Sequence, residues 1–204
     1  MKIICIGQNY YEHCKELNSQ VPKEPMFFMK PDTALPPKPS MPFFYPDFSN
    51  EIHYEIELVA KICRLGKNIE EKFAHKYYEE ISVGIDFTAR DLQRECKDNG
   101  MPWEKAKSFD GSAQVGTFVK KDMFPDLNNV PFSLNQNGKT VQQGNSKDMI
   151  FSFDKIIAYV SQFVTLKIGD HIYTGTPVGV GPVKIGDILE GYIANEKLLE
   201  VKVK

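Results

Sequence analysis

The chain has 204 residues, enough to bury one sizeable hydrophobic core, and a single domain spanning 1–204 is expected. Its formal net charge of −2 gives no electrostatic reason to expect a nucleic acid or an anionic membrane as a partner. The apolar runs are too short to span a membrane, and the first residues lack a signal-peptide pattern, so a cytoplasmic location is expected. The four cysteines show no CxxC spacing and are expected to be reduced thiols.

The first quarter of the chain combines a short strand, a short helix and a long irregular segment. Residues 2–6, which are apolar from Ile3 onward, predict a strand, and a turn at 7–9 leads into a helical stretch at 10–17. Residues 21–46 contain most of the prolines, which favours an extended, irregular path. Because this segment also carries aromatic residues such as Phe27, we expect a structured loop that covers one side of the domain.

The middle of the chain changes from a strand pattern to helical patterns. Residues 52–62 alternate between apolar and polar side chains and therefore predict a strand. Helical patterns follow at 70–80 and at 88–96.

The last third of the chain predicts mostly strands. Residues 132–135 and 139–143 flank Asn137-Gly138, a dipeptide suited to a type I′ turn, so a hairpin is expected. Ser152 is placed to cap a helix whose apolar residues share one face: Ile156, Ile157, Val160, Phe163 and Val164. Short strands are predicted at 170–174, 187–194 and 198–203. Because the helices do not alternate with the strands, the pattern predicts a strand-rich α+β domain.

Glu55 and Glu57 lie two residues apart in the predicted strand, so their side chains point to the same side. At a spacing of roughly 6.5–7 Å along the backbone, two carboxylates repel each other unless a positive charge lies between them. A hard cation such as Mg²⁺, with oxygen ligands at about 2.0–2.1 Å, fits that gap. A bare Glu-x-Glu pattern more often marks a solvent-exposed strand face, so this alternative stays open.

Asp86 supplies a third carboxylate that could join this pair. It ends an apolar run just before a predicted helix start, where an acidic side chain can point into a cavity. Its alternative role is helix capping, although Thr88 is better placed for that. A ligand set of carboxylate oxygens, without paired cysteines or histidines, favours Mg²⁺ or Mn²⁺ over zinc.

Two further features carry candidate catalytic groups. His13 and Glu16 lie three apart in a predicted helical turn, and a carboxylate beside an imidazole fixes its tautomer for work as a general base. The same spacing is also common in surface contacts, and the neighbouring Cys14 points off this face. Lys107 lies between a small residue and Ser108-Phe109, where its charge could stabilise an enolate or bind a carboxylate. Its alternative role is that of an ordinary surface lysine.

Other mechanisms find less support in the sequence. Ser112 lacks the G-x-S-x-G pattern of a serine hydrolase nucleophile. Residues 175–181 are rich in glycine but lack the Gly-Lys-Ser/Thr ending of a nucleotide-binding P-loop. We therefore expect a tight turn whose backbone amides and Thr176 hydroxyl meet an anion.

Seven segments, in this order, resemble the fumarylacetoacetate hydrolase family over nearly the whole chain. They are GQNYYEH (7–13), FMKP (28–31), HYEIE (53–57), DFTARDLQ (86–93), AKSFD (106–110), NG (137–138) and TGTPVGVG (174–181). The chain is most similar to the short branch with acylpyruvases, oxaloacetate decarboxylases and 2-hydroxyhepta-2,4-diene-1,7-dioate isomerases. Residues 94–103 particularly resemble the acylpyruvase and oxaloacetate decarboxylase members.

The resemblance implies a fold, an assembly and roles for named residues. The fold would be the family's mixed β-roll with a few peripheral helices, usually a homodimer. The implied site residues are Glu55, Glu57 and Asp86 as metal ligands, His13 and Glu16 as a dyad on a lid-like segment at about 8–20, Lys107 as the active-site lysine, and Lys30, Arg90, Gln93 and Thr176 around the substrate. Two departures concern substrate choice: many members carry Arg or Leu at position 8, here Gln8, and residues 111–117 lack a common Gly-Pro.

The implied activity is that of a Mg²⁺- or Mn²⁺-dependent enzyme acting on a small 2-oxo or enol acid through a metal-bound enolate. Acylpyruvate C–C hydrolysis and oxaloacetate decarboxylation are the leading reactions. The alternative is isomerisation or decarboxylation of a dienol acid in aromatic catabolism. A non-catalytic binding module on the same fold predicts damage to the metal or dyad residues, and none is seen. A metal-independent hydrolase would still turn over in excess EDTA.

Overall fold

The computed structural model describes residues 1–38 and 41–204. The described chain is a strand-rich α+β domain with three β-sheets, which confirms the predicted fold class. Pro39 and Ser40, part of the predicted irregular segment at 21–46, lie outside the described residues.

The largest sheet has seven strands and carries Lys30, Glu57 and Asp86. Its strand order is β2-β1-β11-β4-β5-β7, with β8 also paired to β5; the bounds are β1 (Ile3–Gly7), β2 (Met26–Lys30), β4 (Ile56–Ile62), β5 (Tyr78–Asp86), β7 (Ala113–Val115), β8 (Val119–Lys120) and β11 (His171–Tyr173). Only the β1–β11 pair among these ladders is parallel. The inner strands are buried almost throughout, so their sequences are close to continuous apolar runs.

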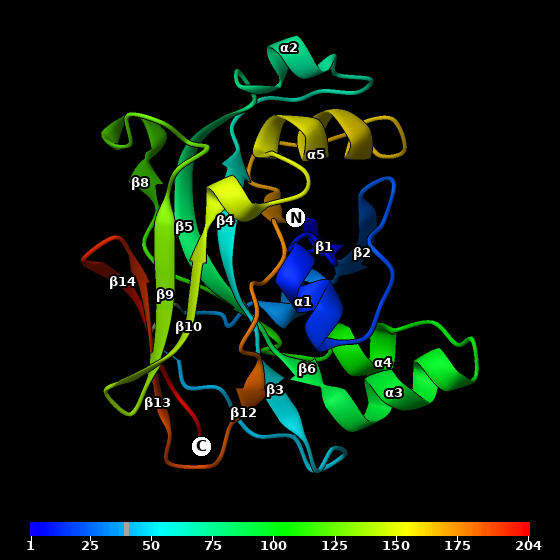
Figure 1. The fold of residues 1–204 in the computed structure, drawn as a ribbon, viewed down its shortest axis with the longest axis vertical. Helices are drawn as coiled ribbons and strands as arrows, with labels where there is room; N and C mark the ends of the chain where they lie inside the picture. Colours follow the sequence, from blue (N-terminus) through cyan, green and yellow to red (C-terminus); the bar gives the residue numbers. More distant parts are fainter. Residues whose placement is uncertain (39–40) are drawn as a thin grey trace.

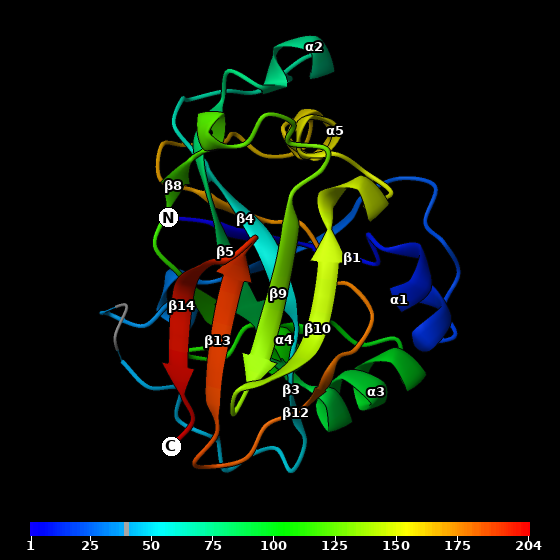
Figure 2. The ribbon, with the colours of Figure 1, turned by 60° about the vertical axis from the view of Figure 1, so that its left-hand side comes forward.

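Two smaller sheets complete the roll. The four-stranded sheet has the order β10-β9-β13-β14, with β9 (Pro131–Gln136), β10 (Lys139–Asn145), β13 (Ile188–Ile193) and β14 (Glu196–Lys202). The three-stranded sheet joins β12 (Gly181–Pro182), β3 (Ile52–Tyr54) and β6 (Thr88–Ala89). Figure 2 shows the four-stranded sheet in front of β4 and β5. The core lies between these layers, where Leu134 and Leu189 join the same apolar cluster as Ile56 and Val83.

Short helices sit at the ends and edges of the sheets. They are α1 (Tyr11–Glu16), α2 (Glu71–Ala74), α3 (Arg90–Asp98), α4 (Glu104–Lys107) and α5 (Phe153–Val160), with 3₁₀ turns at Asp32–Ala34, Lys121–Met123 and Ser146–Asp148. Figure 1 shows α2 and α5 at one end of the molecule and α3 and α4 toward the other. Within the described part of the chain, no helix has the length and apolar character needed to cross a membrane.

Several local predictions are confirmed by the structure. Asn137 and Gly138 have φ values of 53° and 78°, as a type I′ turn between β9 and β10 requires. The Ser152 side chain accepts a hydrogen bond from the Lys155 amide at 3.3 Å and caps α5. The helix ends at Val160, however, so Phe163 lies beyond it and is 56% exposed.

Other predicted elements differ from the structure because strand pairing overrides the local pattern. Part of the predicted irregular segment forms β2, which pairs with β1. The predicted strand at 52–62 is interrupted at Glu55, and its two halves belong to different sheets. The predicted helix at 70–80 is wrong beyond Ala74, because Tyr78 already pairs with Ile62 at the start of β5.

Candidate metal centre and active site

The register of two adjacent strands brings three carboxylates together. Glu55 lies in the break between β3 and β4, Glu57 lies in β4, and Asp86 is the last residue of β5. The Asp86 amide donates to the Glu55 carbonyl at 2.9 Å, so the two residues are held side by side. One oxygen from each of the three side chains lies within 4.8 Å of the others. All three residues are at most 5% exposed, so the alternative of a solvent-exposed strand face is wrong.

Lys107, on α4, is the central cation of this cluster. Its Nζ atom lies 2.8 Å from Glu55 Oε2, 2.9 Å from Asp86 Oδ2 and 2.6 Å from Thr88 Oγ1. The residue is 3% exposed, so the alternative of an ordinary surface lysine is wrong. Thr88 does not cap α3, whose N-cap is Ala89 without a side-chain hydrogen bond. Burial alone would lower the pKa of Lys107, but Asp86 and Glu55 outweigh it and raise this pKa.

Lys30 and Arg90 support the carboxylates from two other sides. Lys30, at the end of β2, places Nζ 2.8 Å from Asp86 Oδ1 and also donates to Ser112 Oγ at 3.0 Å. It is fully covered and lies behind Asp86 rather than along the wall of the cavity described below. Arg90, at the start of α3, donates to Glu55 Oε1 at 2.5 Å and to Gln93 Oε1 at 2.6 Å.

The two glutamates differ in their partners and therefore in their pKa values. Burial raises the pKa of Glu55, but the charges of Lys107 and Arg90 outweigh it and hold that pKa well below its usual range. Glu57 has no ion-pair partner within residues 1–38 and 41–204, and burial together with the nearby Asp86 and Glu55 charges raises its pKa. A buried carboxylate set with unbalanced repulsion at Glu57 is the environment that a divalent cation relieves, and the all-oxygen donors fit such an ion.

The glycine-rich loop at 174–181 anchors Glu57 through a backbone amide. The Gly175 amide donates to Glu57 Oε2 at 2.6 Å. The backbone φ angle of Gly175 is 97°, in the left-handed region. A Cβ atom on Gly175 would lie 2.7 Å from Asn9 Cβ, so the close approach requires glycine. The Thr176 hydroxyl donates to the Ile56 carbonyl at 2.8 Å, which ties the loop to β4. The loop amides were expected to meet an anion, and one anion they meet is Glu57 itself.

The predicted His13–Glu16 pair forms on α1. His13 Nδ1 lies 2.8 Å from Glu16 Oε2, while Glu16 Oε1 accepts a hydrogen bond from the Gly179 amide at 3.0 Å. Glu16 therefore orients the imidazole and docks α1 onto the glycine-rich loop at the same time. Burial raises the pKa of Glu16, but the bonds from His13 and Gly179 outweigh it and lower that pKa.

A small cavity of about 30 Å³ lies between α1 and the carboxylates. Of the predicted site residues, it is lined by His13, Glu55, Glu57, Asp86, Arg90, Gln93, Lys107 and Thr176, whereas Glu16 and Lys30 stand behind this wall. A space of this size holds about one water molecule. A substrate with four carbon atoms is larger than this space.

Two buried polar residues that support the site were not identified from the sequence. Asn9 bonds to the Phe151 and Thr174 carbonyls at 3.0 and 2.7 Å, which fixes the start of the α1 segment. Gln142 accepts from the Ile56 amide at 2.9 Å and donates to Thr176 Oγ1 at 2.9 Å. Asn9 lies within the motif at 7–13, but this motif does not indicate that Asn9 supports the site. Nothing in the sequence around Gln142 marks it.

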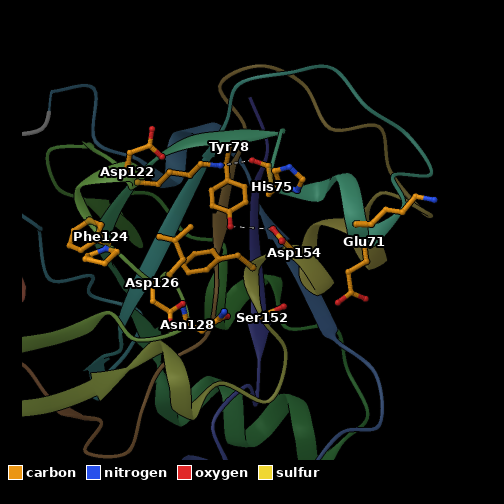
Figure 3. A pocket seen from close by; sticks show the side chains of 14 residues that line it. Glu71, His75, Tyr78, Asp122, Phe124, Asp126, Asn128, Ser152 and Asp154 are labelled. Atoms are coloured by element: carbon orange, nitrogen blue, oxygen red, sulfur yellow. Dashed lines mark hydrogen bonds between the residues drawn. The ribbon is translucent and has the colours of Figure 1, made fainter.

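A second and larger cavity, of about 710 Å³, lies at the far end of the molecule near α2 and α5. Figure 3 shows the Tyr78 hydroxyl pointing toward Asp154, to which it donates at 3.2 Å. Lys121 lies over the Tyr78 ring, 4.5 Å from its centroid. Within the described residues, Glu55, Glu57 and Asp86 form the only cluster of potential metal ligands, so this cavity offers none.

The fold and the small cavity together define a mixed β-roll built around a buried carboxylate centre suited to a divalent cation. Residues 2–204 match the family model described as fumarylacetoacetate (FAA) hydrolase C-terminal. The chain is 43% identical over 202 residues to a Mus musculus protein named oxaloacetate tautomerase, mitochondrial, covering 99% of this chain and 91% of that relative. The chain belongs to the fumarylacetoacetate hydrolase family, which confirms the resemblance found in the sequence.

Two further comparisons describe relatives with other named activities. A Dictyostelium discoideum protein named oxaloacetate decarboxylase, mitochondrial, is 39% identical over 189 residues, covering 93% of this chain and 87% of that relative. The crystal structure of fumarylpyruvate hydrolase from Pseudomonas aeruginosa, in complex with Mn²⁺ and pyruvate, is similar with a TM-score of 0.92 and 34% identity. That match covers 100% of this chain and 89% of the other.

Proposed function

We propose that this protein is a divalent-metal-dependent enzyme that acts on oxaloacetate and closely related 2-oxo acids through an enolate. The buried cluster of Glu55, Glu57 and Asp86, with its repulsion unrelieved at Glu57, is the observation that carries the proposal. The names of the mouse and Dictyostelium relatives support oxaloacetate as the substrate. Mn²⁺ and pyruvate in the Pseudomonas structure support a metal and a 2-oxo acid at such a site.

Glu55, Glu57 and Asp86 would hold Mg²⁺ or Mn²⁺ through their carboxylate oxygens. When bound, the ion supplies positive charge that attracts a substrate carboxylate and 2-oxo oxygen and stabilises negative charge as it develops. The three carboxylates and the three cations Lys30, Lys107 and Arg90 cancel in formal charge. A divalent ion then gives the site a net charge of about +2, which matches a dianionic 2-oxo diacid.

The chain's own residues prepare this site and move protons. Lys107 and Arg90 keep Glu55 deprotonated and oriented, so the ligand atoms are preorganised. Because Glu16 engages Nδ1 of His13, the other ring nitrogen, Nε2, is available as a base on the cavity side. For keto–enol exchange of oxaloacetate, Nε2 would take a proton from C3 and return it to the enolate oxygen, or carry out the reverse.

Decarboxylation of oxaloacetate uses the same orientation with fewer demands on the dyad. The bond between C3 and the distal carboxylate breaks, its electron pair forms the enolate of pyruvate, CO₂ leaves, and the enolate then takes up one proton. No nucleophilic water is involved, so His13 is needed at most for the final protonation.

Acylpyruvate hydrolysis is the second candidate, and the pairing of buried His13 with Glu16 favours it. His13 Nε2 would take a proton from a water molecule that attacks the distal carbonyl carbon. The C–C bond then breaks to give a carboxylic acid and the enolate of pyruvate, which takes up the proton. Isomerisation of a dienol diacid needs only proton shuttling along the chain and remains the runner-up reaction.

A comparison of substrates tests the proposed function. The metal-free protein is reconstituted with Mg²⁺ or Mn²⁺, and kcat/KM is measured for enol oxaloacetate, keto oxaloacetate, acetylpyruvate and a dienol diacid. We expect turnover of at least one oxaloacetate form, abolished by excess EDTA. If no substrate turns over faster than with the free ion, the catalytic proposal is refuted, and full activity in EDTA would refute metal dependence.

The assembly and the compartment remain proposals. A homodimer follows the family pattern, and light scattering of the purified protein would measure its mass directly against the 23.3 kDa chain. A cytoplasmic location rests on the sequence, whereas the mouse and Dictyostelium relatives are named as mitochondrial. Imaging the tagged chain in its own cells tests the compartment.

A further inference from the structure

Four basic side chains line the small cavity: His13, Arg90, Lys97 and Lys107. All but Lys97 are buried and already engaged by protein groups, and His13 pairs with Glu16. Lys107 Nζ has three partners, Glu55, Asp86 and Thr88, one for each of its protons. Lys107 is therefore committed to holding the carboxylate cluster and Thr88.

Arg90 is also engaged by protein groups, through three of its N–H donors. Its Nε atom donates to His53 Nδ1 at 3.4 Å, while its two terminal nitrogens donate to Gln93 and Glu55. A substrate anion could reach this guanidinium only by displacing or sharing a contact that positions Glu55. Lys107 has no idle donor, and the remaining N–H groups of Arg90 belong to a guanidinium that is already paired with Glu55.

Lys97 is different from the other cavity cations. It lies on α3 two turns beyond Arg90, on the face that also presents Gln93 to the cavity. Its Nζ atom lies 5.5 Å from the ring centroid of Trp103, another residue of the cavity wall. Across residues 1–38 and 41–204, Lys97 forms no ion pair, although its outer part is exposed. Burial of its inner part and the nearby Arg90 charge lower its pKa.

We propose that Lys97, resting on Trp103, binds the distal carboxylate of a 2-oxo dicarboxylate and thereby selects diacids over acylpyruvates with an uncharged distal group. The inference rests on the proposed function and names the substrate class within it. The small size of the cavity supports it, because Lys97 and the carboxylate cluster border the same narrow space. A substrate held by its 2-oxo acid end at Glu55, Glu57 and Asp86 then directs its other end toward Lys97 and Trp103 in the same cavity wall.

The chemistry of this contact predicts a selective effect. A charge-assisted hydrogen bond contributes about 1.5–3 kcal/mol, which is roughly a 10- to 150-fold change in affinity. That contribution exists only for a substrate with a distal carboxylate. In keto–enol exchange of oxaloacetate, a proton moves between C3 and the 2-oxo oxygen while the distal carboxylate keeps all its bonds. For this reaction, the loss should therefore appear mainly in KM and only weakly in kcat.

Kinetics of Lys97→Gln test the proposal on two substrates. For keto–enol exchange of oxaloacetate, we expect KM to rise roughly 10- to 100-fold. The value of kcat/KM for acetylpyruvate hydrolysis should change by less than about 3-fold. Lys97→Arg keeps the charge and should restore most of the oxaloacetate affinity. Lys105→Gln is the matched control, because Lys105 is exposed, pairs with Glu95 at 2.8 Å and does not line the cavity.

Binding of unreactive analogues gives a second readout that does not depend on turnover. Malate carries a distal carboxylate, and 2-hydroxybutyrate replaces it with a methyl group. In calorimetric titrations with Mn²⁺ present, Lys97→Gln should weaken malate binding and leave 2-hydroxybutyrate binding unchanged. Equal weakening of both analogues, or no weakening of malate, would show that Lys97 is a solvated lysine covering Trp103.

The outcomes also separate this inference from the proposed function. If the unaltered protein turns over neither oxaloacetate nor acetylpyruvate, the proposed function fails, and the analogue titrations still decide the role of Lys97. If the unaltered protein is active but Lys97→Gln loses both substrates equally, the proposed function stands and the selectivity inference is overturned.

Discussion

Two cavities in the described part of the chain differ in size in the opposite sense to the number of buried charged groups that line them. The cavity near α2 and α5 has a volume of about 710 Å³, while the one beside Glu55, Glu57 and Asp86 has about 30 Å³ (Figures 1 and 3). The larger space is bordered by solvated charges and a single hydroxyl–carboxylate contact, between Tyr78 and Asp154. Of these two cavities, the smaller one therefore carries the chemistry.

The smaller cavity differs from the larger one because several of the charged groups around it are buried. Burying a charge is unfavourable by several kcal/mol unless partners compensate for the lost water. Here three carboxylates and three cations are buried together, and Glu57 is left without an ion pair in the described chain. Such an arrangement opposes stability and is typical of functional sites rather than of structural cores.

The largest expected effect comes from removing the charge of Glu57. Glu57→Gln should lower metal-dependent kcat/KM by about 10³-fold or more, because a ligand and several kcal/mol of charge stabilisation are lost. In EDTA, the same variant should be at least as stable as the unaltered protein, since repulsion with Glu55 and Asp86 disappears while the Gly175 amide keeps an acceptor. Activity assays and thermal melting measure the two effects.

The larger cavity supplies the control for this variant. Tyr78→Phe removes the hydroxyl that contacts Asp154 and should leave kcat/KM within about 2-fold, with a stability loss of about 1 kcal/mol. If Tyr78→Phe abolished activity while Glu57→Gln retained it, the assignment of the two cavities would have to be exchanged.

The dyad on α1 should matter for one reaction more than for another. His13→Ala is expected to lower acetylpyruvate hydrolysis by about 10²-fold or more, the usual contribution of a general base. Oxaloacetate decarboxylation should survive in part because it needs no activated water. Paired kcat measurements with both substrates test this, and metal affinity should be unchanged because His13 is not among the clustered ligands. Equal loss of both reactions would contradict this division of labour.

The sequence predicted the carboxylate centre better than it predicted the surrounding framework. Glu55, Glu57 and Asp86 could be identified because short-range spacing and a family motif both mark them. The buried Lys30 ammonium group is compensated by Asp86 at the end of β5 and by the carbonyls of Phe87 and Ser112, and no local sequence pattern reveals these long-range contacts. The helical pattern at 70–80 failed for a related reason, since pairing of β5 with β4 recruited Tyr78 into a strand.

An intermediate effect is expected at Gly175, which links the loop to the metal centre. Gly175→Ala places a Cβ atom 2.7 Å from Asn9 Cβ at a φ of 97°, so the backbone must shift. The Glu57 carboxylate then loses its amide donor, and metal affinity should fall roughly 10- to 100-fold. Calorimetry with Mn²⁺ measures this change. Gly138→Ala, at a turn with open space around the new Cβ atom, is the matched control and should leave metal affinity unaltered.

The smallest predicted effect compares one carboxyl group from each cavity. Glu16 has its pKa lowered from 4.5, because the bonds from His13 and Gly179 outweigh burial. Asp154 has its pKa raised from 3.8, because burial outweighs the bond from Tyr78. Carboxyl-carbon NMR titration of the intact protein should therefore find Glu16 below its usual value and Asp154 above its own. Glu16→Gln and Asp154→Asn identify the two signals.

The two shifts also have opposite consequences for stability. A carboxyl group with a lowered folded pKa stabilises the protein above its unfolded pKa, and this contribution is lost as the pH falls through the folded pKa. Glu16 should act in this way, by less than about 1 kcal/mol given its partial exposure. Asp154 should act in reverse, so that its contribution declines as the pH rises through its raised pKa. Asp154 lies at the N-terminal end of α5. If Asp154 titrates at or below 3.8, this helix end stabilises the Asp154 charge more strongly than burial opposes it.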